Sequence, residues 1–256
     1  MNYLPIGILI FFICLWLVGF FKANDLSIPS RSPKNIRKIL VILPHPDDES
    51  LTVSGLLNQF SGESYLLTLT HGGAGENASG QAGDLRQIRE QELQKSADII
   101  GIKHLINADF VDGSLTSDRN RLSNFIDNKI NELQPDLVIT YDLSGLYGHP
   151  DHVVVSEIVT ALVKDKYSTT ALWYTTLPQK LLSMINLPTH MATDQSFLEK
   201  RTTPNLKVYI DTSFITRIRS VYAHRSQFNS FRSGVPRLLP LWFAYSFQLF
   251  EYYHEV

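Results

Sequence analysis

The sequence predicts an α/β fold, with a Rossmann-like, mostly parallel sheet, helices on both of its faces, and an N-terminal transmembrane helix. Short apolar runs rich in β-branched residues alternate with longer stretches of helical periodicity, which is typical of a parallel sheet with crossover helices. Polar clusters directly follow two of these runs, and ligands of open α/β sheets bind beyond the carboxyl ends of the strands. Residues 4–21 are apolar almost without interruption. The length of this run, about 18 residues, is near the lower limit for a helix that crosses a bilayer.

Composition divides the 256 residues into four parts. A hydrophobic content of 44% over this length is enough for one substantial core. The net charge of −2 gives no sign of nucleic-acid binding, and the single cysteine, Cys14, cannot form a disulfide or a cysteine metal site within one chain. We expect a membrane anchor over 1–22, an irregular linker over 23–36, the main domain over 37–230 and an aromatic-rich segment over 231–256.

The charges around the apolar N-terminal run predict its orientation. No basic residue precedes it, whereas Lys22, Arg31 and Lys34 follow it. The positive-inside rule then places the rest of the chain in the cytoplasm. We expect a single-pass membrane protein of the endoplasmic reticulum if eukaryotic, or of the plasma membrane if bacterial. The alternatives are a buried helix or a cleaved signal peptide, which normally has positive charge before its apolar core.

The main domain alternates between predicted strands and helices. Gly101 is placed to end the second helix, and the glycine-rich loop 71–80 lacks the spacing of a phosphate-binding loop. That loop is expected to let the backbone approach the site closely. Strands are expected at 39–43, 64–70, 105–110, 137–141, 171–176 and 206–210, and helices at 51–60, 84–100, 119–133, 152–162 and 213–227.

The first polar cluster directly follows the strand 39–43. His45 and Asp48 provide an imidazole nitrogen and a carboxylate oxygen, which are good ligands for zinc. Asp47 remains as a carboxylate that could take a proton from metal-bound water. The alternative is that these acids, with Glu49, cap the following helix, because acids favour a helix N-terminus.

A second cluster follows the strand 137–141, about a hundred residues later, and contains His149, Asp151 and His152. A lone histidine is usually a core or surface residue, but two His/Asp clusters that each follow a strand favour a shared metal site. The segment 44–49, Pro-His-Pro-Asp-Asp-Glu, together with His-Pro-Asp-His at 149–152, resembles the PIG-L/LmbE family of zinc-dependent de-N-acetylases. The resemblance covers roughly residues 37–230 and implies an LmbE-like fold.

The chemistry of the donors and the resemblance together assign roles. Zn²⁺, or another divalent metal, held by His45, Asp48 and His152 would lower the pKa of water and polarise an amide carbonyl. These three ligands leave the open fourth position that a catalytic zinc needs, so no direct role is expected for His71. Asp47 would serve as the general base.

Three further residues of the second cluster are expected to act in catalysis. His149 could stabilise the tetrahedral intermediate and protonate the departing amine if it is cationic. Asp151 could orient His149 or His152 by accepting a hydrogen bond. Tyr147 could donate a hydrogen bond to the oxyanion, as its counterpart in the family does.

Two residues between the clusters are expected to bind substrate. The segment 89–93, Arg-Glu-Gln-Glu-Leu, is similar to a family segment whose arginine contacts the polar head of the substrate, which assigns Arg89 this role. A salt bridge between Arg89 and Glu92 on one helix face is the alternative. Asp112 could accept hydrogen bonds from sugar hydroxyls, as the family's equivalent acid does, or it could stabilise a turn before Gly113.

The aromatic-rich residues 235–250 are too short and too interrupted by Pro236 and Pro240 for a second span. Basic residues precede them, so an interfacial helix on anionic headgroups and packing against the main domain are both open. His224 is expected to be a packed residue at the end of a helix.

These features predict a membrane-anchored zinc-dependent hydrolase that removes the N-acetyl group from N-acetylglucosaminyl-phosphatidylinositol or a similar GlcNAc lipid. The form His-Pro-Asp-His is similar to that of soluble bacterial members, so a bacterial-type deacetylase of another GlcNAc conjugate is the alternative. A metal-dependent phosphoesterase would need bridging ligands beyond those found here. A membrane-bound sugar- or lipid-binding subunit is disfavoured because every proposed ligand and the base are present.

Overall fold

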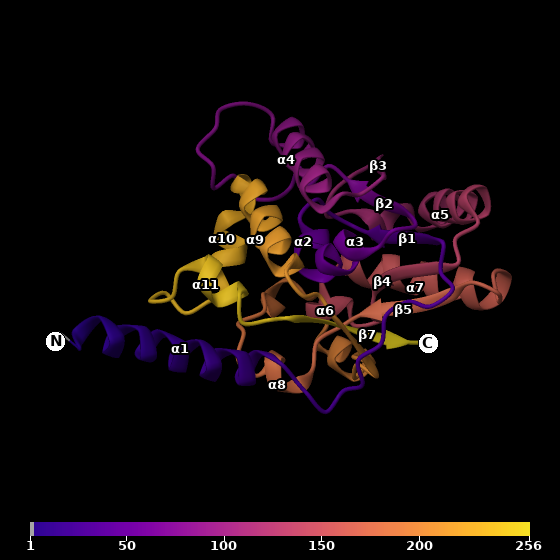
Figure 1. Cartoon of the computed structure of the whole chain (residues 1–256). Coiled ribbons are helices and arrows are strands. Elements are labelled where there is room, and N and C mark those ends of the chain that lie inside the picture. The colour runs from indigo at the N-terminus through magenta and orange to yellow at the C-terminus, as the bar shows by residue number, and fades with distance from the viewer. Residues whose placement is uncertain (1–2) are drawn as a thin grey trace.

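The computed structural model describes residues 3–256, and a seven-stranded sheet lies between two layers of helices (Figure 1). The order of the strands is β3-β2-β1-β4-β5-β7-β6. The five strands from β3 to β5 in that order are parallel, and β7 runs antiparallel to both of its neighbours. The bounds are β1 Lys38–Leu43, β2 Glu63–Thr70, β3 His104–Phe110, β4 Leu137–Tyr141, β5 Ala171–Thr175, β6 Leu206–Tyr209 and β7 Phe250–Glu255.

The helices were mostly expected from the sequence, but their breaks were not. The predicted helix over 51–60 is two short helices that meet at Val53, whose φ of −138° is not helical. The bounds are α1 Leu4–Ala23, α2 Asp48–Thr52, α3 Ser54–Gln59, α4 Leu85–Ile100, α5 Arg119–Leu133, α6 Gly145–Gly148, α7 Pro150–Lys166, α8 Gln179–Leu182, α9 Ser213–Ala223, α10 Phe228–Ser233 and α11 Leu241–Tyr245, with 3₁₀ turns η1 Leu115–Asp118, η2 Thr189–Met191, η3 Gln195–Lys200 and η4 Arg225–Gln227.

Both faces of the sheet are buried, which explains why its central strands are apolar at successive positions. Leu40 and Ile42 of β1 pack with α5 and α7 on one face. Ile39 and Val41 pack with α3 and α4 on the other face. The side chains alternate because successive residues of a strand point to opposite faces, so a single run of five apolar residues contributes to two cores.

In the sheet, β1 lies between β2 and β4. Strands β2 and β3 follow on one side of β1, whereas β4 and β5 lie on its other side, so the order of the strands reverses at β1. Parallel strands carry their carboxyl ends to the same edge of the sheet, and such a reversal opens a crevice there. The loops after β1 and β4 therefore lie next to each other. This is the arrangement that brings the two polar clusters of the sequence together.

The C-terminal segment differs from the expectation. Residues 235–250 do not form one interfacial helix, and the segment instead supplies α11 and then β7, an inner strand that the sequence analysis missed. Glu251 of β7 accepts hydrogen bonds from the backbone N–H groups of Gly55 and Leu56 at 2.7 and 2.8 Å. It also forms a buried ion pair with Arg217 of α9 at 2.9 Å. Residues 250–255 are thus part of the main core.

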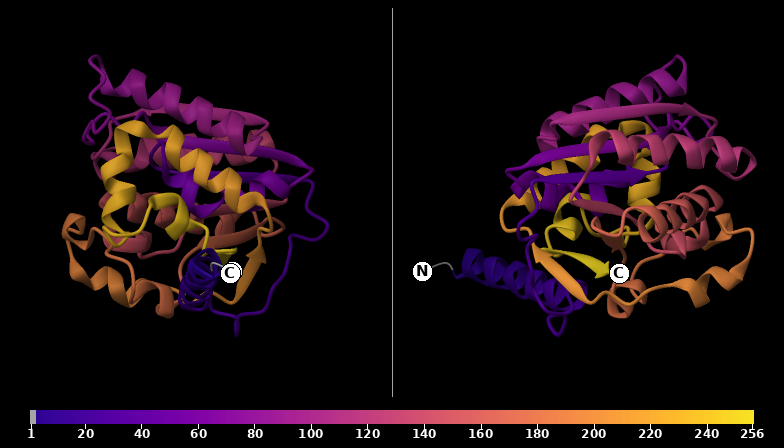
Figure 2. Two further views of the ribbon diagram at one scale, coloured as in Figure 1. Left: turned by 60° about the vertical axis from the view of Figure 1, so that its left-hand side comes forward. Right: turned by 90° about the vertical axis from the view of Figure 1, so that its right-hand side faces the viewer.

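The helix α1 projects from the body of the protein, most clearly in the right-hand view of Figure 2. Its mean hydropathy is 2.7 over an 18-residue window, none of which is buried, so by length and composition it could cross a membrane. Signal sequences pass the same test. Near its C-terminal end, Trp16 donates a hydrogen bond from Nε1 to Ser246 Oγ at 3.0 Å.

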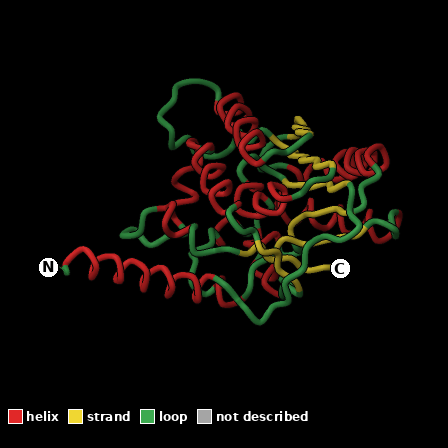
Figure 3. The backbone as a smooth tube through the Cα atoms, in the orientation of Figure 1, coloured by secondary structure: helices red, strands yellow, loops and turns green. Residues whose placement is uncertain are grey.

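A long loop between β2 and α4 arcs away from the sheet and is drawn in green in Figure 3. It contains the glycine-rich residues 71–80. The N–H of Ala78 donates to the carbonyl oxygen of Ser226 at 2.8 Å, and Gln227 donates from Nε2 to the carbonyl oxygen of Glu76 at 2.8 Å. The turn η4 therefore holds this loop beside the edge of the sheet that carries the polar clusters.

Candidate active site

The two polar clusters meet at the carboxyl ends of β1 and β4. His45 follows β1 by two residues, and His152 lies in the first turn of α7 after the short turn α6. Gly145 of that turn has φ +59°, and a Cβ atom there would come within 2.8 Å of the Cβ atom of His152. Glycine is needed at this position because other residues rarely adopt such a φ, and because the imidazole of His152 is packed directly against it.

Three side chains point their donor atoms at one another. Nδ1 of His45 lies 3.2 Å from Nε2 of His152. The two oxygens of Asp48 lie 3.8 Å from Nδ1 of His45 and 3.6 Å from Nε2 of His152. A tetrahedral zinc with bonds of 2.0–2.1 Å separates its ligand atoms by roughly 3.3 Å. The spacing of these donors therefore fits a zinc ion.

The tautomers of the two histidines support the same conclusion. Nδ1 of His152 lies 3.2 Å from the carbonyl oxygen of Gly145, to which it can only donate. Nε2 of His45 lies 3.1 Å from Asp112 and 3.3 Å from Asp151, so this nitrogen also carries a proton. Nδ1 of His45 and Nε2 of His152 therefore face each other, and either a proton or a metal cation must lie between them to avoid repulsion of their lone pairs.

The electrostatics of the site also favour a positive charge between the rings. Burial lowers the pKa of His45, but its hydrogen bonds to Asp112 and Asp151 outweigh burial and raise this pKa to about 10. Burial raises the pKa of Asp48 to about 7 despite the opposing charge of His45. Asp48 accepts hydrogen bonds from the hydroxyl of Tyr141 at 2.8 Å and from the N–H of His45 at 2.9 Å. These contacts fix the carboxylate in place.

Asp47 has an unusual backbone and no role as a helix cap. Its φ is +101°, in the left-handed region, and its side chain makes no capping hydrogen bond to α2. Such a conformation in a residue other than glycine costs of order 1–3 kcal/mol and occurs often at functional sites. Its backbone N–H donates a hydrogen bond to Glu49 Oε2 at 3.0 Å, and its Oδ1 accepts a hydrogen bond from the guanidinium of Arg89 at 3.0 Å. The side chain is thereby held in the cavity that also contains Asp48.

His149 and Tyr147 lie beside the same donors. The ring centroid of His149 is 5.0 Å from those of both His45 and His152, and the three histidines can present nitrogens within 4.8 Å of one another. Burial lowers the pKa of His149 to about 4, so this side chain is neutral at neutral pH. The hydroxyl of Tyr147 is 3.5 Å from Nε2 of His152, and burial raises its pKa well above the ordinary value.

Comparison with known protein families agrees with this geometry. Residues 40–163, which include both polar clusters, match the family model described as PIG-L, GlcNAc-PI de-N-acetylase. The chain carries a PIG-L family domain. The metal site of this PIG-L domain is thus supported both by the spacing of its donors and by its family.

Two curated bacterial relatives have similar sequences. A probable N-acetyl-alpha-D-glucosaminyl L-malate deacetylase of Bacillus anthracis is 35% identical over 134 residues, which cover 49% of this chain and 59% of the relative. A 1D-myo-inositol 2-acetamido-2-deoxy-alpha-D-glucopyranoside deacetylase of Rhodococcus jostii is 31% identical over 156 residues, which cover 50% of this chain and 53% of the relative. The match to the PIG-L domain thus spans little more than half of each relative.

Solved structures share the fold of the PIG-L domain. A zinc-inhibited form of the teicoplanin deacetylase Orf2 has a TM-score of 0.58 at 15% identity and covers 76% of this chain and 86% of its own. The 4-carboxy-2-hydroxymuconate hydratase GalB of Pseudomonas putida has a TM-score of 0.60 at 15% identity, and the match covers 86% of this chain and 96% of GalB. A deacetylase and a hydratase share this architecture, so the fold alone does not determine the reaction.

Asp112 and Asp151 contact His45 in the PIG-L domain. Asp151 is fully buried and accepts hydrogen bonds from the N–H groups of Gly113 and Leu115 at 2.8 and 3.1 Å. Its carboxylate orients His45 rather than His149 or His152, which were the expected partners. Asp112 accepts from His45 and from the N–H of Ala74 at 2.8 Å. The sequence did not predict that both acids contact Nε2 of His45, on the side of the ring opposite the nitrogen that faces His152.

His71 lies outside this group. Its Nδ1 accepts a hydrogen bond from Asn107 Nδ2 at 3.1 Å, and its ring is 3.8 to 3.9 Å from the exposed carboxylates of Asp109 and Glu90. These contacts anchor the beginning of the glycine-rich loop to β3 and α4. The absence of a direct role for His71 in the chemistry stays a prediction.

Arg89 is buried, and its contacts are with the protein itself. Its guanidinium donates to the carbonyl oxygen of Gly72 at 2.8 Å, to the carbonyl oxygen of Pro46, and to Asp47. A Cβ atom at Gly72 would lie 2.3 Å from the guanidinium carbon, so glycine makes this approach feasible. Glu92, the alternative partner of Arg89, instead accepts hydrogen bonds from the N–H and hydroxyl of Ser226.

These contacts predict that Arg89→Lys lowers kcat by about 10²-fold and changes KM little, because a small displacement of a catalytic group is enough for such a loss. Steady-state kinetics with a deacetylation substrate measures both constants. Arg86→Lys is the control, because Arg86 lies on the same helix but is half exposed. A large rise in KM at unchanged kcat would show instead that Arg89 holds the substrate, as the sequence first suggested.

Behind Asp47 lies a buried ion pair that the sequence did not predict. Nε2 of His224 is 2.7 Å from Oε1 of Glu49, and both side chains are fully buried. The hydroxyls of Ser50 and Ser96 also donate to Glu49 Oε1. The other oxygen of Glu49 accepts the N–H of Asp47. His224 is thus a packed helix-end residue, as expected, and it also neutralises the carboxylate that fixes the backbone of Asp47.

The pair predicts how stability depends on pH. Burial raises the pKa of Glu49, but His224 outweighs it and lowers this pKa to about 2. Burial lowers the pKa of His224, but Glu49 outweighs it and raises this pKa above 6.5. Ionised Glu49 contributes fully to the free energy of unfolding above about pH 4.5, and this contribution is lost as the pH falls toward 2. Protonated His224 contributes fully below about pH 6.5, and its contribution is lost as the pH rises through its folded pKa.

We therefore expect His224→Gln to lower the free energy of unfolding most strongly between about pH 4.5 and 6.5, by about 3–5 kcal/mol, because it leaves a buried carboxylate unpaired. Urea unfolding of the wild type and the variant from pH 4 to 9 measures this difference. His190→Gln, at an exposed position, is the control. A difference that does not change over this range would contradict the assigned ion pair.

Proposed function

We propose that the protein is a zinc-dependent amidohydrolase that removes the N-acetyl group from a GlcNAc conjugate. The observation that carries this proposal is the convergence of Nδ1 of His45, Nε2 of His152 and the carboxylate of Asp48, with a second carboxylate, Asp47, held close by. The names of the two bacterial relatives support acetylated sugar conjugates as substrates. They favour the bacterial-type alternative over N-acetylglucosaminyl-phosphatidylinositol.

In this mechanism His45, Asp48 and His152 would hold the metal. Bound zinc supplies a Lewis acid for the amide carbonyl and acidifies water toward neutrality. Asp47 takes the proton of the attacking water, and burial raises the pKa of this carboxylate, which strengthens it as a base. Tyr147 keeps its proton because its pKa is raised, so its hydroxyl can donate to the oxyanion of the tetrahedral intermediate.

Breaking the C–N bond requires a proton on the amine nitrogen. A cationic His149 was expected to supply it, but the pKa of His149 is lowered to about 4. We infer that Asp47 returns the proton it took from water, so that the acetate and the amine leave with the atoms of one water molecule added. His149 then contributes by polar contact with the intermediate.

Release of acetate tests the proposal. The purified full-length protein, loaded with zinc, is incubated with GlcNAc glycosides of inositol and malate and with a GlcNAc phosphate, and acetate, free amine and phosphate are measured. Equal amounts of acetate and amine from at least one glycoside are expected. Phosphate without acetate would indicate a phosphoesterase instead, and binding without either product would indicate a sugar-binding subunit.

We also propose that α1 anchors the protein in a membrane with the PIG-L domain on the cytoplasmic side. The support is the uncovered apolar surface of α1 and the basic residues that follow it, Lys22, Arg31 and Lys34 among them. After expression in a bacterial host, the protein should resist extraction with alkaline carbonate. Release into the soluble fraction would contradict the anchor.

A further inference from the structure

Asp142 is a buried carboxylate that the proposed mechanism does not use. It directly follows β4, and its side chain is fully buried. Oδ1 accepts hydrogen bonds from the hydroxyl of Ser144 and from the N–H groups of Ser144 and Leu146, the latter two at 3.1 and 3.4 Å. Oδ2 accepts from the N–H and hydroxyl of Thr202 at 2.9 and 3.2 Å. The carboxylate therefore joins the turn α6 to a segment 60 positions further along the chain.

The turn that Oδ1 holds has a strained backbone. Gly145, Leu146 and Gly148 have φ values of +59°, +66° and +82°. With ψ at −51°, Leu146 is close to a classic γ-turn, a conformation that is rare and strained. Such a residue keeps its conformation only where surrounding groups hold it. The next residue is Tyr147, the proposed donor to the oxyanion, so the turn determines where this side chain lies.

Charged side chains hold both sides of Leu146. Its N–H donates to Asp142, and its carbonyl oxygen accepts a hydrogen bond from the guanidinium of Arg201 at 2.6 Å. The same guanidinium lies 5.7 Å from the ring centroid of Phe197 in η3, within the range of a cation–π contact. Arg201 and Thr202 are consecutive residues. One short segment after η3 thus fixes the turn from two directions.

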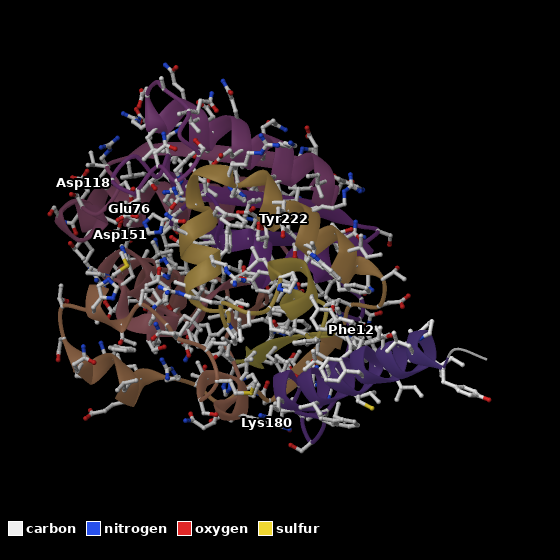
Figure 4. All side chains as sticks on the ribbon, turned by 90° about the vertical axis from the view of Figure 1, so that its left-hand side faces the viewer. Phe12, Glu76, Asp118, Asp151, Lys180 and Tyr222 are labelled. Carbon is white, nitrogen blue, oxygen red and sulfur yellow. The ribbon has the colours of Figure 1, made fainter. Side chains whose placement is uncertain are left out.

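The turn leads directly into α7 and the metal site. Figure 4 labels Asp151, which lies in the first turn of that helix. The carbonyl oxygen of Gly145 accepts a hydrogen bond from Nδ1 of His152 at 3.2 Å, and the hydroxyl of Tyr147 lies 3.5 Å from Nε2 of the same histidine. A displacement of the turn would therefore move this hydroxyl relative to a proposed metal ligand.

We propose that Asp142 and Arg201 are positioning residues for the reaction, because they fix the turn 144–148 and thereby hold the hydroxyl of Tyr147 at the oxyanion. Tyr147 lines the cavity at the metal site, whereas neither of these two residues does. They act through Tyr147 and not on the substrate. The inference rests on the proposed function, because it takes Tyr147 to stabilise the tetrahedral intermediate.

Asp142→Asn tests the inference at nearly constant side-chain volume. In either orientation of the amide, its NH₂ group faces a backbone N–H, that of Ser144 or that of Thr202. We expect kcat to fall by about 10²-fold at unchanged KM, because a small displacement of a catalytic group is enough for such a loss. Arg201→Met removes the hydrogen bond to Leu146 and should have the same effect. Steady-state kinetics of the full-length protein at saturating zinc, with the GlcNAc glycosides of inositol and malate, measures both constants.

Asp136→Asn is the matched control. Asp136 lies just before β4, at the opposite end of this strand, and its carboxylate likewise accepts two backbone N–H groups, those of Arg37 and Lys38 at 2.8 and 2.9 Å. Its kcat should equal that of the wild type. An equal loss in Asp136→Asn and Asp142→Asn would overturn the proposal, because any weakening of the sheet would then have the same effect.

A double-mutant cycle with Tyr147→Phe separates positioning from a general loss of structure. Tyr147→Phe alone is expected to lower kcat by about 10²–10³-fold, as for the loss of one oxyanion donor. In that background, Asp142→Asn or Arg201→Met should lower kcat by less than about threefold more, because they act through the hydroxyl that is already missing. Losses that multiply would overturn the proposal.

Fluorine NMR of the full-length protein with 3-fluorotyrosine incorporated at Tyr147 reports on the turn without any reaction. The wild type and Asp136→Asn are expected to give the same spectrum, whereas Asp142→Asn and Arg201→Met should shift the resonance by more than its line width. Such shifts in a protein that releases no acetate would support the positioning, and only the assignment of the reaction would fail. An unchanged spectrum in both variants would overturn the proposal whatever the activity.

Discussion

Asp47→Asn is expected to lower the kcat of deacetylation by about 10²–10⁴-fold and to leave zinc binding intact, because it removes the proposed general base without removing a metal ligand. Asparagine keeps the size of the side chain and tolerates the left-handed backbone at φ +101° better than most residues. Kinetics of amine release and the zinc content of the purified variant, measured by mass spectrometry, give the two quantities.

Asp98→Asn is the control for this substitution, since Asp98 is an exposed residue of α4 whose carboxylate accepts a hydrogen bond from Gln94 of the same helix. Its activity should equal that of the wild type. If Asp47→Asn keeps near wild-type turnover, another group takes the proton from water. Loss of zinc together with turnover would instead show that Asp47 is needed to form the metal site.

His152→Ala is expected to lose zinc itself. The side chain is fully buried, and its Nε2 is one of the three donors that lie 3.2 to 3.8 Å apart. Substitution of an outer residue around a metal site typically costs 10–100-fold in affinity, so removing a ligand should cost at least about 10²-fold. Competition with a chelator of known affinity measures the loss, and activity should fall below detection at limiting zinc.

The matched control is His104→Ala, which removes a half-exposed imidazole of β3 that pairs with Glu63 on the surface. It should bind one zinc with unchanged affinity. Unchanged affinity in His152→Ala as well would place the metal elsewhere, for example on His45 with Asp112 and Asp151, whose ligand atoms lie within 4.8 Å of one another. The two variants therefore locate the site directly.

The convergence of the proposed metal ligands could be predicted because each polar cluster is marked by a local pattern in the sequence. Each cluster directly follows a run of apolar residues, and parallel strands bring their carboxyl ends to one edge of the sheet. His45 and His152 therefore converge although 107 positions separate them. The same logic predicted β1, β2 and β4 nearly to their ends, because their apolar runs are buried on both faces.

The contacts around these ligands could not be predicted, because they depend on how separate elements dock. Asp151 faces His45 because the loop around Gly113 donates two N–H groups to its carboxylate. The pairing of Glu49 with His224 spans 175 positions, and no local pattern marks it. The strand β7 was hidden because its residues, Phe250-Glu251-Tyr252-Tyr253, include a charged side chain whose burial depends on partners far along the chain, Arg217 and the N–H groups of Gly55 and Leu56.

The position of β7 has a consequence for biosynthesis. Within the sheet β6 is joined to the other strands through β7, although β6 is translated more than forty residues earlier. Apart from an isolated bridge between Ser30 and Lys207, β6 pairs with no other strand within residues 3–256. It therefore completes its pairing only after residues 250–255 have emerged from the ribosome. Until then its edge is open to pairing with other nascent chains. We infer that this interval is when the protein is most vulnerable to aggregation, and that a chaperone acting late in translation would increase its yield most.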